Sequence, residues 1–233
     1  MLEGLSVRVA FITLGQSPRD DIMVDIKPYL EEVECVEYGA LDGLPLNRVV
    51  KEFSPLPNEV SYVSRLRDGT EVVLSKSKIS VRLQSLVSLV EGSVDLIVIL
   101  CTGDFNLSSR TPIIYPSVEL VRAVRKLSPS SIGVIVPLSS QVVMARNRWG
   151  GIASIAGIEV WSPYTGSAED LANSALRLRH ADIIVMDCLG YSLKHKEVVR
   201  EVSGRRTIVP REVVVSAIKE ALIYSIKERR AQQ

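Results

Sequence analysis

An apolar run that ends in a cysteine and a glycine occurs twice in this chain, and this repeat limits the folds that the chain can adopt. The second copy is DIIVMDCLGY (Asp182–Tyr191), and the first is DLIVILCTG (Asp95–Gly103). Their matching aspartates, cysteines and glycines are each separated by 87 positions. Unbroken Ile/Val runs of this length are typical of strands buried on both faces of a parallel sheet. The repeat predicts two similar α/β halves, each with a cysteine just past the carboxyl end of a strand, where ligands bind in open α/β sheets.

Composition favours an ordinary soluble α/β protein and argues against several other classes. The 233 residues suffice for one large or two small domains, and 46% are apolar and 24% charged. A net charge of +1 gives no electrostatic reason to expect nucleic acid or a membrane surface as a partner. No apolar run approaches the roughly 20 residues that span a bilayer, and Met1–Ser6 lacks the regions of a signal peptide. Three cysteines favour the reducing cytoplasm over a disulfide framework.

Strands and helices are predicted to alternate along the chain, which favours parallel sheets joined by right-handed crossovers. We expect a first strand at Val7–Leu14, a β-hairpin turning at Asp68-Gly69, and a strand at Ile132–Val136 that opens the second half. Helices are predicted over residues 20–31, 46–53, 77–91, 117–127, 140–156, 168–180, 193–203 and 210–227. A further strand is expected at residues 158–161. Because the last helix is expected to return to the first half, the predicted domains are residues 1–113 with 210–233, and residues 114–209.

Cys101 and Cys188 are the candidate catalytic residues. A thiolate is a competent base, and the thiol pKa falls from about 8.5 when the cysteine lies at a helix N-terminus. Each cysteine is expected where a strand leads into such a helix. Two thiols on opposite sides of a substrate carbon, about 7–8 Å apart, could then act as base and acid. The alternative is that both are buried strand residues, since free cysteine packs as a small hydrophobe, and Cys35 is interpreted in that way.

The loops at the same sheet edge supply hydrogen-bond donors that suit a carboxylate. Hydroxyls and backbone N–H groups at helix starts are the donors that such an anion needs. Each of these residues taken alone is also a common cap or turn residue. The candidates for substrate binding are Thr13, Gly15, Gln16, Ser17, Thr102, Gly103, Asn106, Ser139, Ser140, Gly190 and Tyr191.

Three cations are further candidates for binding an anion. Arg19 follows the loop after the first strand, while Lys76 and Lys78 lie at the start of a predicted helix, where a positive charge opposes the macrodipole. A cation in this unfavourable position can mark an anion site. The alternative for all three residues is a solvated position on the surface. Arg146 and Arg148 are interpreted as surface residues. No phosphate loop, Walker motif or zinc spacing is present, and no metal site is expected.

Several segments resemble the AroM-like family, a branch that looks like the aspartate/glutamate racemase superfamily. The segments are TLGQSPR, SKSKI, VILCTG, VIVPLSSQ and DIIVMDCLGY, and the resemblance extends from Val7 to about Leu222. It implies two flavodoxin-like α/β domains with a cofactor-free site in the cleft between them. The superfamily racemises, isomerises or decarboxylates small carboxylates. Cys101 and Thr102 match its first catalytic cysteine and the neighbouring threonine, and Cys188 matches the second cysteine.

The chain departs from the racemase pattern on both sides of Cys188. Racemases usually have glycine before this cysteine and a hydroxyl residue after it, whereas this chain has Asp187 and Leu189. A neighbouring carboxylate raises a thiol pKa unless a cation offsets it. We therefore expect either a cation near Asp187, with Arg19, Lys76 and Lys78 as candidates, or a share for Asp187 in the acid/base role.

Two function hypotheses follow from these residues. The first is a cofactor-independent racemase, isomerase or lyase that acts on a small carboxylate through Cys101 and Cys188. The second is a non-catalytic protein that senses a small carboxylate in the same cleft. Both predict a cytoplasmic protein whose partner is a small anion, and a homodimer is an open hypothesis.

Overall fold

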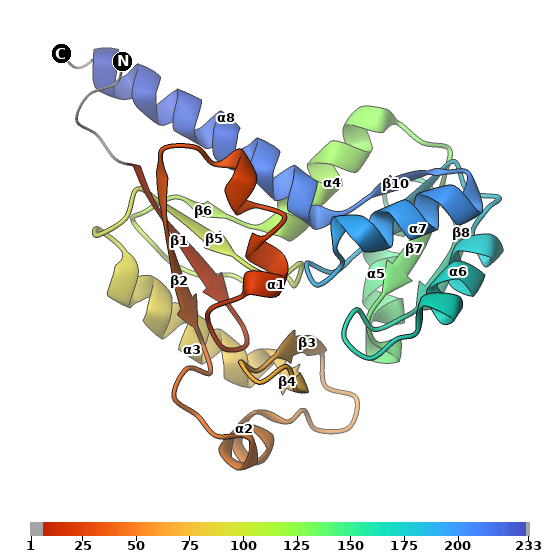
Figure 1. Ribbon diagram of the computed structural model, residues 1–233, viewed down its shortest axis with the longest axis horizontal. Coiled ribbons are helices and arrows are strands. Elements are labelled where there is room, and N and C mark those ends of the chain that lie inside the picture. The colour runs from red at the N-terminus through yellow and green to blue at the C-terminus, as the bar shows by residue number, and fades with distance from the viewer. Residues whose placement is uncertain (1–6, 232–233) are drawn as a thin grey trace.

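Two parallel four-stranded sheets form the framework of the molecule (Figure 1). The computed structural model describes the backbone of residues 7–231 and the side chains of residues 7–223. The first sheet has the order β2 (Val33–Gly39), β1 (Val7–Thr13), β5 (Leu96–Ile99), β6 (Ile113–Ile114). The second has the order β8 (Ser154–Val160), β7 (Ser131–Val136), β9 (Ile183–Met186), β10 (Arg206–Ile208). When the strands of each sheet are numbered along the chain, both sheets have the spatial order 2-1-3-4, which is how the strand order of flavodoxin-like folds begins. The predicted fold class is confirmed.

Helices cover both faces of the first sheet because its strands are apolar on both sides. Along β1, Ala10 and Ile12 pack with α2 (Leu46–Phe53) and α3 (Lys76–Val90). The alternate residues Val9 and Phe11 face α1 (Asp20–Met23) and α8 (Pro210–Ala231). This period of two, with apolar residues on both faces from Val9 to Ile12, is the pattern that unbroken apolar runs predict.

The second sheet is enclosed in the same way. One face packs on α4 (Pro116–Leu127) and α5 (Val142–Gly150). The other face packs on α6 (Ala168–Arg177) and α7 (Leu193–Ser203). No helix of residues 7–231 is long and apolar enough to span a membrane.

The two halves exchange helices at their junction. The chain leaves the first sheet at β6 and enters α4, which packs on the second sheet, and it leaves β10 through α8, which returns to the first. Helices α4 and α8 also contact each other, as Figure 1 shows. The division into domains at residues 113/114 and 209/210 stays a prediction, and its outer limits at residues 1 and 233 lie outside the described part.

The predicted hairpin is confirmed and lies at the edge of this junction. β3 (Ser61–Arg65) pairs antiparallel with β4 (Glu71–Ser75), with Ser61 opposite Ser75 and Arg65 opposite Glu71. Two short 3₁₀ helices complete the elements, η1 (Lys27–Tyr29) and η2 (Ser139–Gln141).

Two predicted helices extend well beyond the observed ones, and those expected over 168–180 and 210–227 end instead at Arg177 and Ala231. The helix expected over residues 20–31 ends at Met23, because Pro28 has no N–H to continue the α-helical hydrogen bonds, and the 3₁₀ helix η1 follows instead. The helix expected over residues 140–156 ends at Gly150, and β8 starts at Ser154 rather than Ile158. Consecutive glycines at 150 and 151 have low helix propensity, which explains the early end.

Candidate active site

The two predicted cysteines lie in turns of the same geometry at the ends of β5 and β9. Cys101 N–H donates to the Ile99 carbonyl (2.8 Å), and Cys188 N–H donates to the Met186 carbonyl (3.0 Å). Two residues further on, Gly103 N–H donates to Cys101 Sγ (3.2 Å) and Gly190 N–H donates to Cys188 Sγ (3.4 Å). The 87-residue sequence repeat is therefore also a repeat of hydrogen bonds around each sulfur.

The two turns meet across the junction of the halves. Thr102 Oγ1 donates a hydrogen bond to the Asp187 carbonyl (3.2 Å), which joins the residue after the first cysteine to the residue before the second. Each thiol lies close enough to Asp187 for that carboxylate to act on its pKa, and Cys188 acts on the pKa of Cys101 as well. The fold thus brings Cys101, Thr102, Asp187 and Cys188 together.

Both thiols are held in their protonated form. Burial raises the pKa of Cys188 to about 12 and raises the pKa of Cys101 further. The expectation of a helix N-terminus directly after each cysteine is wrong, because the next helices start only at Pro116 and Leu193. The Gly103 and Gly190 N–H groups lower the two pKa values, but their effect is smaller than that of burial.

Asp187 is buried and paired, and its partner is a residue that the sequence interpretation placed on the surface. Arg148 Nη1 lies 3.1 Å and 2.9 Å from the two carboxylate oxygens, and Trp149 Nε1 donates to Oδ2 (2.9 Å). The Arg148 side chain is 9% exposed and that of Asp187 is 3% exposed. The surface interpretation of Arg148 is therefore wrong, although Arg146 is exposed as expected. The cation beside Asp187 is also not Arg19, Lys76 or Lys78.

A helical spacing could have identified Arg148. Ala145 and Trp149 are both buried and four positions apart on α5, and Arg148 is three positions after Ala145, so all three share one face. A cation on a buried helix face needs a buried anion. Asp187 is the buried carboxylate that the sheet presents to that face.

Tyr62 is a second residue of the site that sequence reasoning missed. With Thr102, Arg148 and Asp187 it lines a small internal cavity of about 10 Å³. The Asp104 N–H donates to its hydroxyl (3.1 Å), and burial followed by the proximity of Cys101 raises its pKa. Such a cavity has room for about one water molecule, and neither cysteine lines it.

Arg19 is buried at the junction of the halves rather than solvated. Its guanidinium binds Asp21 through Nε and Nη2 (both 2.8 Å), and Nη1 donates to Thr13 Oγ1 (3.0 Å). Nη2 also donates to the hydroxyl of Tyr164 from the second half (2.9 Å). Burial raises the pKa of Tyr164 to about 12, although the charge of Arg19 opposes this. A buried cation therefore lies near the Cys188 turn.

Arg211 at the start of α8 holds the Cys188 turn in place. It donates to the carbonyls of Leu189 (2.9 Å) and Gly190 (2.8 Å), and its Nη1 donates to the Asp21 carbonyl and to Asp25 Oδ2 (both 2.7 Å). The side chain is 1% exposed. Nothing in the local sequence marks this arginine, because its partners are distant carbonyls.

Several predicted substrate-binding residues hydrogen-bond within the protein. Gln16 Nε2 donates to the carbonyls of Leu41 and Leu44, and its Oε1 accepts from Arg67 N–H. Ser17 donates to Asp42 (2.6 Å). Gly15 packs so closely on the Arg65 carbonyl that a Cβ would lie 2.1 Å from it.

The other predicted residues divide between the junction and its surroundings. Tyr191 is fully buried, and its hydroxyl donates to the Trp161 carbonyl (2.7 Å). Ser140 Oγ lies 3.0 Å from Ser61 Oγ across the halves, while Asn106 and Ser139 are exposed. Substrate binding by any of these residues stays a prediction.

The two lysines at the start of α3 lie apart from the cysteine turns. Lys78 Nζ donates to the Ser54 carbonyl (2.8 Å), and Lys76 is half-buried. Ser75 caps this helix by accepting from Lys78 N–H (3.3 Å). Within residues 7–223, no cluster of three or more His, Cys, Asp or Glu side chains could hold a metal ion.

Comparison with known proteins shows the family and the fold. The model of the AroM protein family matches residues 9–222. No curated protein matches the sequence. The structure is similar to allantoin racemase from Klebsiella pneumoniae, with a TM-score of 0.68 at 15% identity over 94% of this chain and 89% of that one.

Two further solved structures share the fold. Maleate isomerase Iso from Pseudomonas putida S16 has a TM-score of 0.59 at 15% identity, covering 93% of this chain and 92% of that one. Picrophilus torridus aspartate racemase has a TM-score of 0.54 at 11% identity, covering 92% of this chain and 94% of that one. Arylmalonate decarboxylase is also among the similar structures. At these identities the likeness shows a fold shared with racemases, isomerases and a decarboxylase.

Proposed function

The chain belongs to the AroM protein family, and from that premise we propose that it is a cofactor-independent racemase, isomerase or lyase acting on a small carboxylate. The observation that carries the proposal is the pair of cysteine turns of equal geometry that meet at the junction of the halves. Packing alone does not require two thiols at equivalent strand ends facing one site. Maleate isomerase, aspartate racemase and arylmalonate decarboxylase, which share the fold, are named for carboxylate substrates.

In this proposal Cys188 is the base and Cys101 the acid. The Cys188 thiolate takes the proton from the substrate carbon, the electron pair moves into an enediolate-like carboxylate, and the Cys101 thiol returns a proton to the opposite face. Cys188 is the better base candidate because two buried cations, Arg19 and Arg211, lower its pKa, whereas Arg148 is the cation that lowers the pKa of Cys101. The cycle leaves a thiol at 188 and a thiolate at 101, ready for the reverse reaction.

Asp187 sets the electrostatic balance of this pair. Its charge raises the pKa of both thiols, while Arg148 lowers that of Cys101. In the proposed mechanism Asp187 acts through Arg148 and the thiols, because its two oxygens already accept from Arg148 and Trp149. Thr102 and the buried guanidinium of Arg19 are the proposed groups for the substrate carboxylate.

A sensor that binds the same anion is the second candidate, and one observation favours it. Both thiols are protonated at neutral pH in the described arrangement, and a protonated thiol is not a base. A sensor would need only the anion site and the movement of the halves. A cytoplasmic location and a homodimer remain hypotheses for either function.

Deuterium exchange separates the two candidates. The protein is incubated in D₂O with aspartate, maleate, phenylmalonate and allantoin, and proton NMR follows loss of the carbon-bound proton, isomerisation or decarboxylation. An enzyme should convert at least one class, and Cys101→Ser and Cys188→Ser should each abolish conversion while Cys35→Ser, in β2, retains it. Ligand binding that persists in both serine variants, with no exchange in the wild type, would establish the sensor instead.

A further inference from the structure

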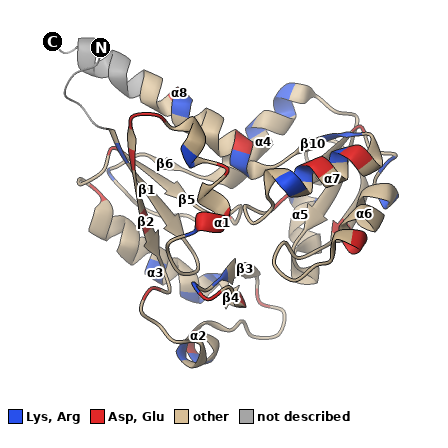
Figure 2. Ribbon diagram, in the orientation of Figure 1, with Lys and Arg blue, Asp and Glu red and all other residues tan. Residues whose placement is uncertain are grey.

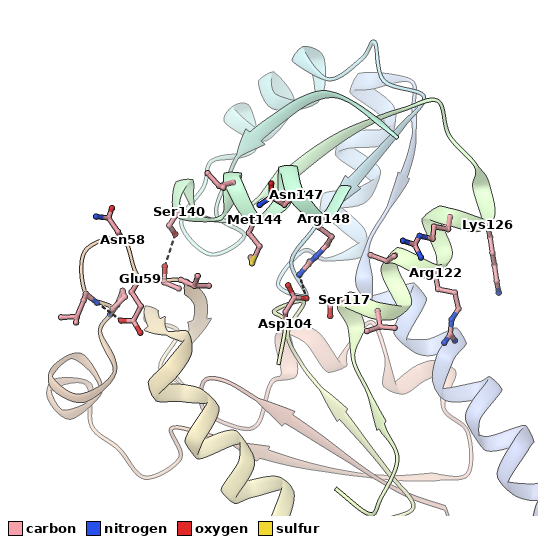
Figure 3. Close-up of a pocket in the computed structure, with 18 residues that line it drawn as sticks. Asn58, Glu59, Asp104, Ser117, Arg122, Lys126, Ser140, Met144, Asn147 and Arg148 are labelled. Atoms are coloured by element: carbon pink, nitrogen blue, oxygen red, sulfur yellow. Dashed lines mark hydrogen bonds and ion pairs between the residues drawn. The ribbon is translucent and has the colours of Figure 1, made fainter. Parts of the chain in front are cut away.

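A large groove lies beside the cysteine site and is bounded by parts of both halves. It has a volume of about 1370 Å³ and runs between α4, α5 and the loop that precedes β3; we call it the α4–α5 groove. Figure 3 shows it with Asn58 and Glu59 at one end, Arg122 and Lys126 at the other, and Arg148 between them. Small-molecule sites usually have volumes of about 300–1,000 Å³, so this groove exceeds the need of a four-carbon diacid.

The lining of the groove is apolar along its length and cationic at one end. Leu56, Val118 and Val143 line it with more than half of their surface exposed. Arg125 and Lys126 line it from α4, whose basic residues are visible in Figure 2, and neither forms an ion pair within the described side chains. An apolar surface that ends at unpaired cations suits an amphipathic anion.

Arg148 connects the groove with the inner cavity. Arg148 and Met144 line both spaces. Nη1 of Arg148 binds the buried Asp187, whereas Nη2 binds Asp104 Oδ1 (2.8 Å), whose side chain is 57% exposed. Asp104 is thus a carboxylate from the groove wall that occupies the outer face of a nearly buried guanidinium. A ligand carboxylate can replace it without leaving Asp187 unpaired.

We propose that the α4–α5 groove binds an amphipathic dicarboxylate, one carboxylate of which takes the place of Asp104 on Arg148. The apolar body of the ligand lies over Val118 and Val143, and its second carboxylate lies at Arg125 and Lys126. The inference goes beyond the proposed function, because neither cysteine lines the groove: its ligand is a carboxylate with a long apolar body, distinct from the small substrate of the thiol site.

Titration calorimetry with two diacids of equal charge tests the apolar part. Decanedioate and succinate differ only in the number of methylene groups, and each buried methylene adds to affinity. Decanedioate is expected to bind at least about tenfold more tightly than succinate. Equal affinities for the two diacids would overturn the proposal.

Two matched pairs of variants locate the binding. Val143→Asp places a negative charge in the groove, whereas Val81→Asp places it on α3 outside the groove, and the two valines are 69% and 68% exposed. We expect Val143→Asp to weaken decanedioate binding at least about fivefold and Val81→Asp to change it less than about twofold. Equal effects of the two variants would show that the diacid binds elsewhere.

The second pair tests the exchange at Arg148. Asp104→Asn removes the competing carboxylate, and Glu59→Gln removes the groove's other anion, which accepts from Ser77 rather than from Arg148. Asp104→Asn should tighten decanedioate binding several-fold, and Glu59→Gln should not. Unchanged or weaker binding by Asp104→Asn would refute the exchange.

The double variant Cys101→Ser/Cys188→Ser separates this inference from the proposed function. It should bind decanedioate as the wild type does, because neither cysteine lines the groove. Tight decanedioate binding by a wild-type protein that exchanges no substrate proton would refute the enzyme proposal and support the groove site. Proton exchange on small carboxylates, with decanedioate bound no more tightly than succinate, would support the enzyme proposal and refute the groove site.

Discussion

Asp187 occupies the position equivalent to Leu100 in the sequence repeat, so one half carries a buried carboxylate where the other carries an apolar side chain. The backbone is the same at both positions: Leu100 N–H donates to the Ile12 carbonyl and Asp187 N–H to the Ile135 carbonyl, both at 2.8 Å. Burying a charge is costly unless it is paired and hydrogen-bonded. Arg148 and Trp149 meet this requirement, which explains how the sheet tolerates the acid.

Removing Arg148 should therefore destabilise the protein. In Arg148→Met the carboxylate of Asp187 stays buried without its cation, and breaking a buried pair in this way costs about 3–5 kcal/mol. The control is Arg146→Met, which truncates an exposed arginine on the same helix. Urea unfolding at pH 7.5 measures both, and a difference between the two variants below about 1 kcal/mol would contradict the buried pair.

Asp187→Asn should make Cys188 more reactive. Burial is the main reason for the raised pKa of this thiol, but the charge of Asp187 raises it as well. Without that charge the pKa falls from about 12, and the thiolate fraction at pH 8 rises accordingly. The rate of Cys188 alkylation by iodoacetamide as a function of pH, followed by peptide mass spectrometry, measures the change. Equal apparent pKa values in the two proteins would show that Asp187 does not act on the thiol.

The sequence could predict the two cysteines but not their partners. Cys101 and Cys188 follow apolar runs with a constant spacing, which is a local signal. Arg19 and Arg211 reach partners far away in the chain, such as Tyr164 and Gly190. No local pattern encodes contacts of that kind, and both arginines are ordinary helix-start residues in the sequence.

At the scale of elements, the strand-to-loop turns decide where the thiols lie. Gly103 is needed because Tyr62 packs against the turn: a Cβ on Gly103 would lie 2.6 Å from Tyr62 Cζ. Gly190 is confined in a similar way by Pro163 Cγ (2.7 Å) and Tyr164 Oη (2.8 Å). Each turn thus packs against a tyrosine at the glycine whose N–H donates to the cysteine sulfur.

Gly103→Ala should destabilise the first turn. The added methyl group must displace the Tyr62 ring, and overpacking of this kind costs about 1–3 kcal/mol. Gly150→Ala is the matched control, because a Cβ there meets nothing nearer than Ile155 Cγ1 at 4.0 Å and the residue is helical. The control should keep or slightly raise the melting temperature. Loss of stability in both variants, or in neither, would argue against a tight turn at Gly103.

Sequence patterns predicted strands better than helix ends in this chain. The strands β5 and β9 are apolar at every position, and such runs have few other interpretations. The ends of α1 and α5 depend on a few helix-breaking residues, namely Pro28 for α1 and the glycines at 150 and 151 for α5. The effect of these residues competes with the apolar periodicity around them. The pattern therefore extended both helices too far.

At the scale of the whole molecule, the site depends on the exchange of α4 and α8 between the halves. Arg211 at the start of α8 ties the Cys188 turn of the second half to Asp21 and Asp25 of the first. Folding of the halves therefore partly buries both cysteines at the same time as it brings the turns together.

Stability should consequently fall at alkaline pH. The thiol pKa is about 8.5 in an unfolded chain and about 12 for Cys188 in the folded protein, so between these values the folded state binds more protons. Because the unfolded state then binds fewer protons, the free energy of unfolding decreases as pH rises. The double variant Cys101→Ala/Cys188→Ala lacks these groups and should lose less stability between pH 7.5 and 10 in urea unfolding. Parallel losses in the two proteins would show that the thiols are not buried.

The central claim is that one ligand lies between the two thiols, and a crystal structure of the protein grown with malonate tests it most directly. We expect the malonate carbon between Cys101 Sγ and Cys188 Sγ, with the sulfurs about 7–8 Å apart and each roughly 3–3.5 Å from the carbon. A carboxylate that contacts only one sulfur, or sulfurs whose separation leaves no room for a carbon between them, would contradict the claim.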